Sequence, residues 1–170
     1  LFDLIHTLDS LALGETLSRH GMQRGRPVHV LLEINIAAET TKHGLSPAGA
    51  ESLLPALGAL PGLIIEGLMT IPPAETGDAA RPYFRAVREL RARLRRNAPA
   101  NAPLTELSMG MSADFEAAIA EVIKEGKERT YDMGGTSTDV CLIVDGRPAP
   151  AAAAPWCARR RGACPPTGRA

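Results

Sequence analysis

VHVLLEINI, residues 28–36, is the stretch that decides the fold class. It is dense in β-branched and leucine side chains, which is typical of a strand buried on both faces in a parallel sheet. A loop follows, and then Ser46 and Pro47, which are favoured at the N-cap and at the first position of a helix. The helix predicted after them has one apolar face, which carries Ala50, Leu53, Leu54 and Leu57. A buried strand followed by a helix is the unit that this stretch predicts.

The same unit recurs on both sides of residues 28–36. Before it, a short apolar strand is followed by an N-cap at Ser10 and a helix with Leu13 and Leu17 on one face. After it come two more strands, each followed by a helical pattern. Four consecutive strand–helix units predict an α/β fold with a parallel sheet and right-handed crossovers. The predicted strands are 4–8, 28–36, 63–71 and 104–109, and the later helices are 79–96 and 113–125, the last ended by Gly126.

The last two predicted helices differ in their polar faces. The helix over 79–96 has Phe84, Val87, Leu90 and Leu94 on its inner side and arginines at 85, 88, 91, 93, 95 and 96 on its outer side. Because no aromatic residues are interleaved for base stacking, we expect a solvated face in preference to a nucleic-acid surface. For the helix over 113–125 the spacing predicts that Phe115, Ile119, Val122 and Ile123 face inward.

The composition favours one soluble globular domain. The chain has 170 residues, of which 45% are hydrophobic, with 19 acidic and 19 basic side chains. No apolar run approaches the ~18 residues of a membrane span, and the first residues lack the features of a signal peptide. We therefore expect a cytoplasmic protein without a membrane or nucleic-acid partner; the sequence does not indicate the oligomeric state. Cys141, Cys157 and Cys164 have no metal-ligand spacing and are interpreted as free thiols.

The stretch LSMGMSADFE, residues 107–116, joins the last predicted strand to its helix. Ser112 is placed to cap that helix, and Gly110 allows a ligand to approach the backbone. The start of a helix offers unpaired N–H groups and the positive end of its dipole, which together suit a phosphate. A capped turn that holds no ligand remains the alternative, because many such loops have this chemistry without binding anything.

Four motifs together resemble a known family. They are IHTLDS, VLLEINIAAETTKHGLSP, LPGLIIEGLMTIPP and ELSMGMSADFEAAIAE, and in this order they are similar to the pyridoxal phosphate homeostasis proteins over residues 1–126. The resemblance implies an alanine racemase N-terminal-type (β/α)8 TIM barrel, of which this chain would hold roughly the fourth to seventh strand–helix units. It also implies pyridoxal 5′-phosphate as the cofactor, with its phosphate held by Ser108, Gly110, Met111 and Ser112. Met69 would lie near the cofactor ring, or would be a core methionine.

The same resemblance bears on the covalent chemistry. The family's Schiff-base lysine precedes the segment that matches Leu1, so we expect a truncated form without that lysine. Lys42, Lys124 and Lys127 belong to a loop or to the far end of a helix and are poor substitutes. The histidines at 6, 20, 29 and 43 are scattered, and no acid–base pair is apparent. A non-catalytic carrier with impaired cofactor binding is therefore expected in preference to an enzyme, and no metal site is expected.

The remainder of the chain departs from that family. Residues 129–148, within a predicted hairpin segment 127–148, resemble the hydantoinase A and oxoprolinase family. That resemblance implies a nucleotide turn at Gly134 and Gly135 with Asp132 or Asp139 near a metal ion, and it gives an ATP-dependent amidohydrolase fragment as the alternative function. A hairpin that binds nothing is the plainer interpretation. Residues 149–170 are rich in Ala, Pro and Arg and predict a disordered tail. A fusion of two sequences, or a half barrel with no function of its own, is also open.

Overall fold

The computed structural model describes residues 2–73, 77–111, 114–123, 129–133, 140–144 and 147–148. Strands and helices alternate from the first strand through residue 123, which confirms the four predicted strand–helix units. The elements, in chain order, are β1 (Ile5–Leu8), α1 (Leu11–Gln23), β2 (Val28–Glu33), α2 (Pro47–Gly58), β3 (Leu63–Met69), the 3-10 turn η1 (Gly77–Ala80), α3 (Arg81–Arg95), β4 (Glu106–Ser108), α4 (Phe115–Ile123), β5 (Arg129–Met133), β6 (Val140–Val144) and β7 (Arg147–Pro148).

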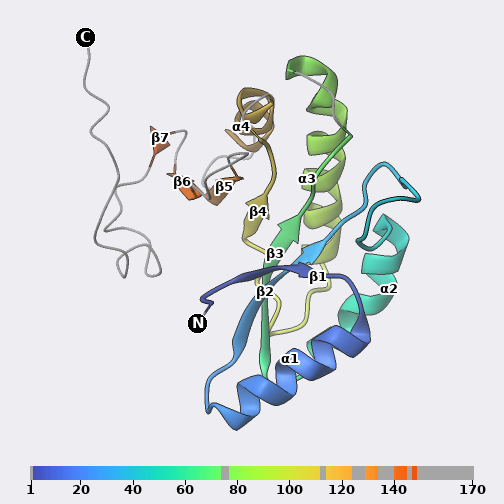
Figure 1. The fold of residues 1–170 in the computed structure, drawn as a ribbon, viewed down its shortest axis with the longest axis vertical. Helices are drawn as coiled ribbons and strands as arrows, with labels where there is room; N and C mark the ends of the chain where they lie inside the picture. Colours follow the sequence, from blue (N-terminus) through green and yellow to red (C-terminus); the bar gives the residue numbers. More distant parts are fainter. Residues whose placement is uncertain are drawn as a thin grey trace.

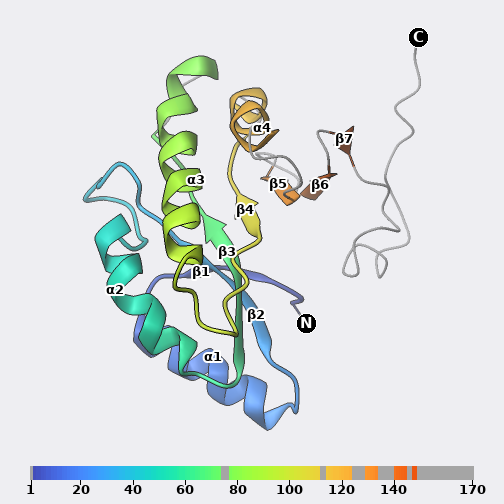
Figure 2. The ribbon, with the colours of Figure 1, turned by 180° about the vertical axis from the view of Figure 1, so that it is seen from behind.

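The strands form one sheet in the order of the sequence, from β1 to β7. Strands β1 to β5 pair in parallel, whereas β6 and β7 continue the sheet in antiparallel pairs. Helices α2 and α3 lie on the same side of the strands, as the two opposite views show (Figures 1 and 2). The order β1–β2–β3–β4 with helical connections is the pattern of a parallel α/β sheet, as the sequence predicts.

The core lies between the helices and one face of the sheet. It is built from fully buried side chains of β2 and β3, such as Val30, Leu32, Ile65 and Leu68, packed against the helices. The predicted inner face of α3 is confirmed, because Phe84, Val87, Leu90 and Leu94 all belong to this core. Leu31 and Met69 are also buried but do not belong to this cluster. Alternation along each strand therefore places a second, smaller set of side chains on the opposite face.

The first two helices start where the sequence predicts. Ser10 and Ser46 have extended backbones and accept hydrogen bonds from Leu13 N (3.4 Å) and Gly49 N (3.0 Å) respectively. Each serine satisfies one of the amide groups that the first turn leaves without a partner. Helix α1 then approaches α2 closely at Gly14, where an added Cβ would lie 2.5 Å from a methyl carbon of Leu57.

Strand β2 is shorter than the predicted 28–36, because the side chain of Asn35 folds the following loop. Its amide Nδ2 donates to the carbonyls of Glu39 (2.8 Å) and Lys42 (3.2 Å), and its Oδ1 accepts from Glu39 N at 3.0 Å. These bonds turn the chain away from the sheet direction, as asparagine does in Asx-type turns. Strand β3 likewise ends at Met69, two residues before the predicted end at Ile71.

Strands β3 and β4 approach closely at Gly67. A Cβ at this position would overlap the carbonyl oxygen of Glu106 in the neighbouring strand. The register between β2 and β3 also shifts here, since Val30 pairs with Ile65 and Leu31 pairs with Gly67. The extra residue, Glu66, forms a bulge that bends the strand. Glycine at 67 therefore allows β4 to follow the bend.

The sheet is strongly curved, as one contact across it shows. His6 Nδ1 on β1 lies 3.0 Å from Ser108 Oγ on β4, although β2 and β3 lie between these strands. In a flat sheet, strands three places apart would be separated by about 14 Å, because neighbours are ~4.8 Å apart. Two short side chains could not span that gap. The face opposite the helices is therefore concave, as in a barrel wall.

The predicted inner face of α4 is wrong at Phe115, whereas Ile119 on that face is half-buried. Phe115, expected to face inward, is 36% exposed, whereas Ala117, Ala118 and Glu121 are buried. Val122 is buried as predicted, and the side chain of Ile123 lies outside the described residues. The spacing of apolar residues alone led to the prediction that the larger side chains, such as Phe115, face the core. The helix instead packs its alanines inward and brings a carboxylate against α3, which the periodicity of apolar residues does not indicate.

The expectation of a solvated arginine face on α3 is wrong for two arginines. Arg91 is only 1% exposed and donates to the carbonyl of Thr105 at 3.0 Å. The Arg88 side chain is 14% exposed and contacts both the carboxylate and the carbonyl of Glu121. The carboxylate of Glu121 is fully buried and therefore needs cationic partners. Arginines of α3 supply them.

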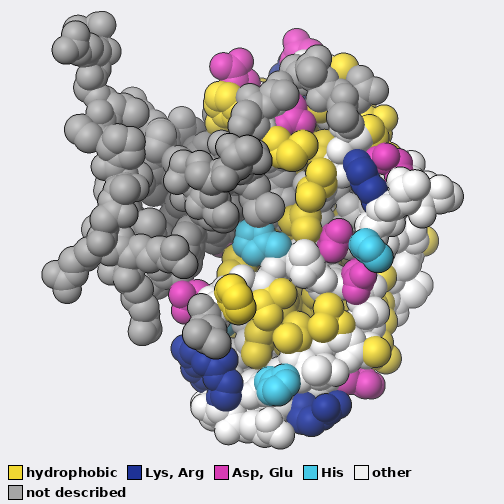
Figure 3. Space-filling view, in the orientation of Figure 1, with side chains coloured by type: hydrophobic (Ala, Val, Ile, Leu, Met, Phe, Trp, Pro, Cys, Tyr) yellow, Lys and Arg dark blue, Asp and Glu magenta, His cyan; other side chains and the backbone are white. Residues whose placement is uncertain are grey.

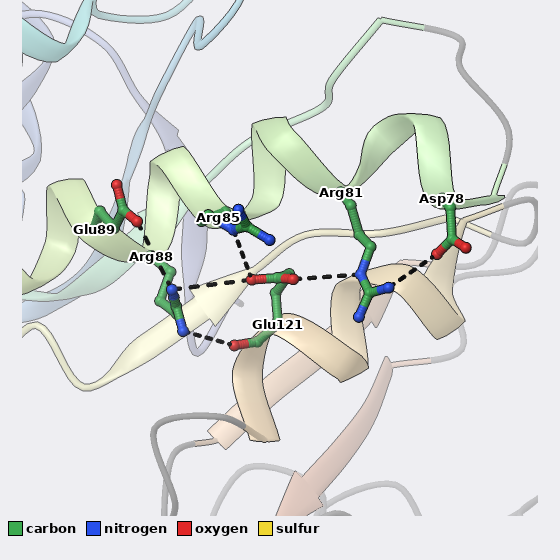
Figure 4. A network of polar contacts seen from close by, with 6 residues as sticks. All are labelled: Asp78, Arg81, Arg85, Arg88, Glu89 and Glu121. Atoms are coloured by element: carbon green, nitrogen blue, oxygen red, sulfur yellow. Dashed lines mark hydrogen bonds and ion pairs between the residues drawn. The ribbon is translucent and has the colours of Figure 1, made fainter.

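Figure 4 shows this cluster between the two helices. Glu121 Oε1 lies 3.3 Å from Arg81 Nε, and its Oε2 lies 3.5 Å from Arg85 Nε and 3.9 Å from Arg88 Nη2. Asp78 contacts Arg81 at 3.3 Å, and Glu89 contacts Arg88 at 3.9 Å. Three arginines and three carboxylates thus balance in charge. Charge pairing therefore joins α3 to α4 here, beside the apolar core to which both helices contribute.

Candidate functional site

The carboxyl ends of the parallel strands meet at one edge of the sheet. Glu33, Met69 and Ser108 are register partners across β2, β3 and β4, so the last residues of these strands lie side by side. Ligands bind at this edge in parallel α/β sheets. Two predicted site residues, Met69 and Ser108, are therefore brought together. Both are buried, Met69 being 3% and Ser108 1% exposed.

Ser108 is held at its side chain and at its backbone. Its hydroxyl shares the 3.0 Å hydrogen bond with His6 Nδ1, and its carbonyl accepts from Thr70 N at 3.0 Å. Thr70 is itself anchored, because its hydroxyl donates to the carbonyl of Ile34 at 2.8 Å. Residues that follow β2 and β3 thus fix the position of the last residue of β4. Sequence reasoning did not identify His6 as part of the site, although strand alternation could have placed it on the concave face.

Gly110 shapes the loop that leaves β4. Its φ of +96° lies in the region that favours glycine. A Cβ there would also lie 3.0 Å from the Cβ of Ala118 and 3.3 Å from the Cα of Phe115. The loop backbone therefore lies directly against the first turns of α4. Packing against α4 is thus a reason for glycine at 110 that is separate from the predicted approach of a ligand.

The start of α4 differs in detail from the predicted serine cap. The first helical hydrogen bond runs from Phe115 N to the carbonyl of Met111 at 2.9 Å. Asp114, which is 3% exposed, accepts from Met111 N at 2.6 Å. This is the half of a capping box in which an acidic side chain reaches back to the first residue. Ser112, the predicted cap, lies outside the described residues.

Asp114 therefore changes the role expected for Met111. The amide of Met111 already donates to this carboxylate, so it is not among the donors free to hold a phosphate. Met111 is not a capping residue type, so its pairing with Asp114 carries no signature in the sequence.

Several charged groups surround this edge. Burial lowers the pKa of His6. Burial also raises the pKa of Glu33, at the end of β2; the charge of Asp9 raises it further, whereas His43 lowers it. Both shifts favour the neutral side chain, because a charge loses hydration when it is enclosed. Figure 3 shows hydrophobic, histidine and acidic side chains gathered together in the middle of the face seen in Figure 1.

Lys42 lies in the loop after β2, as predicted, and its amine has several partners. It donates to the carbonyls of Pro72 (2.9 Å) and Ile71 (3.3 Å) and pairs with Glu39 at 2.7 Å. The lysine thus ties the loop after β2 to the loop after β3. Lys124 and Lys127 lie outside the described residues.

The described part of the chain offers neither a metal site nor a membrane-spanning helix. There, no three His, Cys, Asp or Glu side chains come together in a way that could hold a metal ion. No described helix is long and apolar enough to cross a membrane.

Comparison with known proteins decides the family. Residues 2–126 match the alanine racemase N-terminal domain family. The chain belongs to this family. The matched range includes the four strand–helix units and the Gly110 loop, and it ends before β5. The α/β fold with its parallel sheet fits the TIM-barrel-like architecture of the family.

Curated relatives carry a common name. The pyridoxal phosphate homeostasis protein of Aquifex aeolicus is 43% identical over 119 residues, which are 69% of this chain and 51% of that protein. The protein of the same name from Pseudomonas aeruginosa is 37% identical over 121 residues, which are 71% of this chain and 50% of that protein. The chain therefore spans about half the length of these curated relatives.

Solved structures of PipY are also similar to this chain. PipY of Synechococcus elongatus, solved without pyridoxal phosphate, has a TM-score of 0.65 at 39% identity, over 71% of this chain and 56% of PipY. The same protein solved with pyridoxal phosphate bound has a TM-score of 0.65 at 36% identity, over 78% of this chain and 59% of PipY. The similarity thus extends to a protein that binds this cofactor.

Proposed function

We propose that this chain binds pyridoxal 5′-phosphate and takes part in intracellular pyridoxal phosphate homeostasis. The observation that carries the proposal is the position of Met69 and Ser108, which are register partners at the ligand-binding edge of a sheet of this family. The curated relatives, of which this chain covers about half, are named for this role. PipY has been solved with the cofactor bound. A cytoplasmic location follows from this role.

The described strands support a partial barrel. In our proposal, β1 to β4 are the fourth to seventh strand–helix units of a (β/α)8 barrel, and β5 occupies the place of the next strand. The concave face and the parallel pairing of Glu106, Leu107 and Ser108 with Arg129, Thr130 and Tyr131 both favour this assignment. Residues 1–126 would then form the cofactor-binding part, with residues 127–148 as an added hairpin segment and 149–170 as a tail.

The residues present suit a phosphorylated pyridine. The hydroxyl of Ser108 supplies a donor and the start of α4 a positive dipole end for the phosphate, and Gly110 keeps the loop free of a side chain. Met69, buried beside Ser108, would contact the ring. Met111 would contribute its place in the loop but not its amide, which Asp114 already binds. Ser112 completes the predicted set.

A carrier is favoured over an enzyme. When bound, pyridoxal phosphate supplies an electrophilic aldehyde, which a lysine amine can attack. Lys42, the lysine nearest to this edge in sequence, already donates to two carbonyls and pairs with Glu39. We therefore expect non-covalent, weakened binding through the phosphate and the ring.

Two matched glycine variants test the proposal. Gly110 and Gly25 both have positive φ, +96° and +66°, but no atom lies within 4 Å of an added Cβ at Gly25. Alanine is strained at both positions, more so at the φ of +96°, and only at Gly110 would its Cβ also press on α4, so Gly25→Ala controls for positive φ alone. We expect Gly110→Ala to weaken binding of pyridoxal phosphate about tenfold or more, measured by absorbance titration, and Gly25→Ala to leave it unchanged.

The covalent aspect has its own measurement. Borohydride reduction of the loaded chain, followed by mass analysis, should give no pyridoxyl-lysine. A modified lysine would contradict the non-covalent proposal while leaving cofactor binding intact. Absence of saturable binding by the wild-type chain would contradict the proposed function itself.

The alternative function, an ATP-dependent amidohydrolase fragment of hydantoinase type, has little support. The antiparallel pairing of Asp132 with Cys141 fits the expected hairpin. However, Gly134, Gly135 and Asp139 lie outside the described residues, and the family match ends at residue 126. Magnesium-dependent ATP binding that is lost in Asp132→Ala would be needed to revive it.

A further inference from the structure

The bond between His6 and Ser108 links the first described strand to the candidate phosphate site. Ser108 Oγ and His6 Nδ1 are 3.0 Å apart, within the normal range for a hydrogen bond. Because β2 and β3 separate the two strands, the bond depends on the curvature of the sheet and not on neighbouring strand pairing. His6 can therefore influence Ser108 only in the folded, curved sheet.

The direction of this bond determines what Ser108 can do. A serine hydroxyl has one hydrogen to donate and two lone pairs that accept, and a neutral histidine carries a proton on only one ring nitrogen. If His6 Nδ1 lacks the proton, the Ser108 hydrogen is used up in donating to it. If Nδ1 carries the proton, it donates to Ser108 Oγ, and the hydroxyl hydrogen remains for another acceptor.

We propose that His6 is a positioning residue for phosphate: its Nδ1–H donates to Ser108 Oγ and directs the Ser108 hydroxyl hydrogen to the phosphate of bound pyridoxal phosphate. This inference rests on the proposed function and adds to it a residue outside the glycine loop. Ser108 is held in place, because it is 1% exposed and its carbonyl accepts from Thr70 N.

The burial of His6 makes the direction of this bond matter. Burial lowers the pKa of His6, so the ring is neutral near pH 7 and the choice of tautomer matters. In this arrangement Nδ1–H donates to Ser108 Oγ, and the Ser108 hydroxyl donates to a phosphate oxygen. Each hydrogen therefore meets an acceptor. A phosphate oxygen is also the stronger acceptor, because hydrogen bonds to charged groups exceed neutral ones in strength.

Paired ligands separate this role from a structural one. Pyridoxal phosphate and pyridoxal share the ring and the aldehyde but differ in the phosphate. We expect the wild-type chain to prefer pyridoxal phosphate, and His6→Leu to reduce that preference about tenfold while its affinity for pyridoxal stays the same. His6→Asn, whose side-chain N–H can replace Nδ1–H, should retain most of the preference. His20→Leu, at an exposed position of α1, is the matched control and should change neither affinity.

A double variant and a spectrum complete the test. Ser108→Ala should lose as much preference as His6→Leu, and the double variant should lose no more than either, because the two residues act as one unit. The ¹⁵N shifts of the wild-type chain should show the Nδ1–H tautomer of His6, a readout that needs no variant to fold.

Each contrary outcome has a definite meaning. An Nε2–H tautomer, or an equal loss of both ligands in His6→Leu, would overturn the inference. Equal affinity of the wild-type chain for both ligands would overturn this inference alone and leave ring binding intact. Binding of neither ligand would overturn the proposed function as well.

Discussion

The two pairs of neighbouring helices contact each other in two different ways. Helices α1 and α2 meet through apolar contact, with Gly14 lying against Leu57, and both begin at serine caps that the sequence displays. Helices α3 and α4 meet through arginines gathered around the buried carboxylate of Glu121. Since α4 begins at the Gly110 loop, the candidate site adjoins the helix pair that carries the charge cluster. This pair adds a buried carboxylate with its arginines to an apolar core that α3 and α4 share.

The largest expected effect lies in the apolar half. Leu57 is fully buried between α2 and α1, and Leu57→Ala would leave a cavity that the rigid neighbours cannot fill. We expect the free energy of unfolding to fall by about 3 kcal/mol, measured by urea denaturation. Leu53→Ala, on the same helix but only partly buried, is the control and should cost clearly less. Equal losses would mean that burial does not govern this interface.

The charged half should respond nearly as strongly. Glu121→Ala leaves Arg88 enclosed without its carboxylate, and we expect a loss of about 2–3 kcal/mol, below the full range for buried pairs because Arg81 and Arg85 are partly exposed. The loss should shrink at high salt in Glu121→Ala relative to wild type, since screening weakens arginine repulsion. Glu89→Ala removes a 56% exposed carboxylate from the same cluster and should change stability by less than about 0.5 kcal/mol. A loss in Glu89→Ala as large as that in Glu121→Ala would show that burial is not what matters.

The same contrast explains how far the sequence could predict the fold. Strand–helix order, the Ser10 and Ser46 caps and the core face of α3 follow from local spacing, and all are confirmed. The orientation of α4 does not follow from local spacing, because it is set by Glu121 meeting arginines some 36 residues earlier in the chain. Apolar periodicity cannot register such a contact. Phe115 was therefore placed inward when it is exposed.

The site was predictable to a similar extent. Met69 and Ser108 could be named because motif resemblance and strand ends coincide, and the structure makes them neighbours. Strand alternation could have placed His6 on the concave face, but its bond to Ser108 spans two intervening strands and depends on sheet curvature, so this pairing was missed. Asp114 was also missed, because Met111, which it pairs with, is not a capping residue type. The candidate residues named from the sequence follow from local motifs and strand ends. The contact of His6 with Ser108 depends on long-range geometry, which the sequence does not display.

A smaller effect should appear where α4 meets the loop. Asp114→Ala removes the acceptor for Met111 N, and loss of one capping bond typically costs about 1 kcal/mol. The free amide could then face the ligand, so binding of pyridoxal phosphate should change more than stability does. Glu116→Ala, an exposed acidic residue in the first turn of α4, tests whether charge alone is responsible. If both variants behave alike, the contact with Met111 is not what shapes the loop.

The smallest expected effect is the dependence of the free energy of unfolding on pH that protonation of His6 causes. Burial lowers the pKa of His6 in the folded chain below its ordinary value of 6.5, so the unfolded chain binds the proton more readily. The contribution is fully present above pH 6.5 and is lost as the pH falls through the folded pKa. Unfolding free energies measured between pH 7.5 and pH 5 should therefore fall more in the wild type than in His6→Asn, which has no ring to protonate. Parallel profiles would show that His6 is solvated, and that the contact which curves β1 toward β4 does not persist in solution.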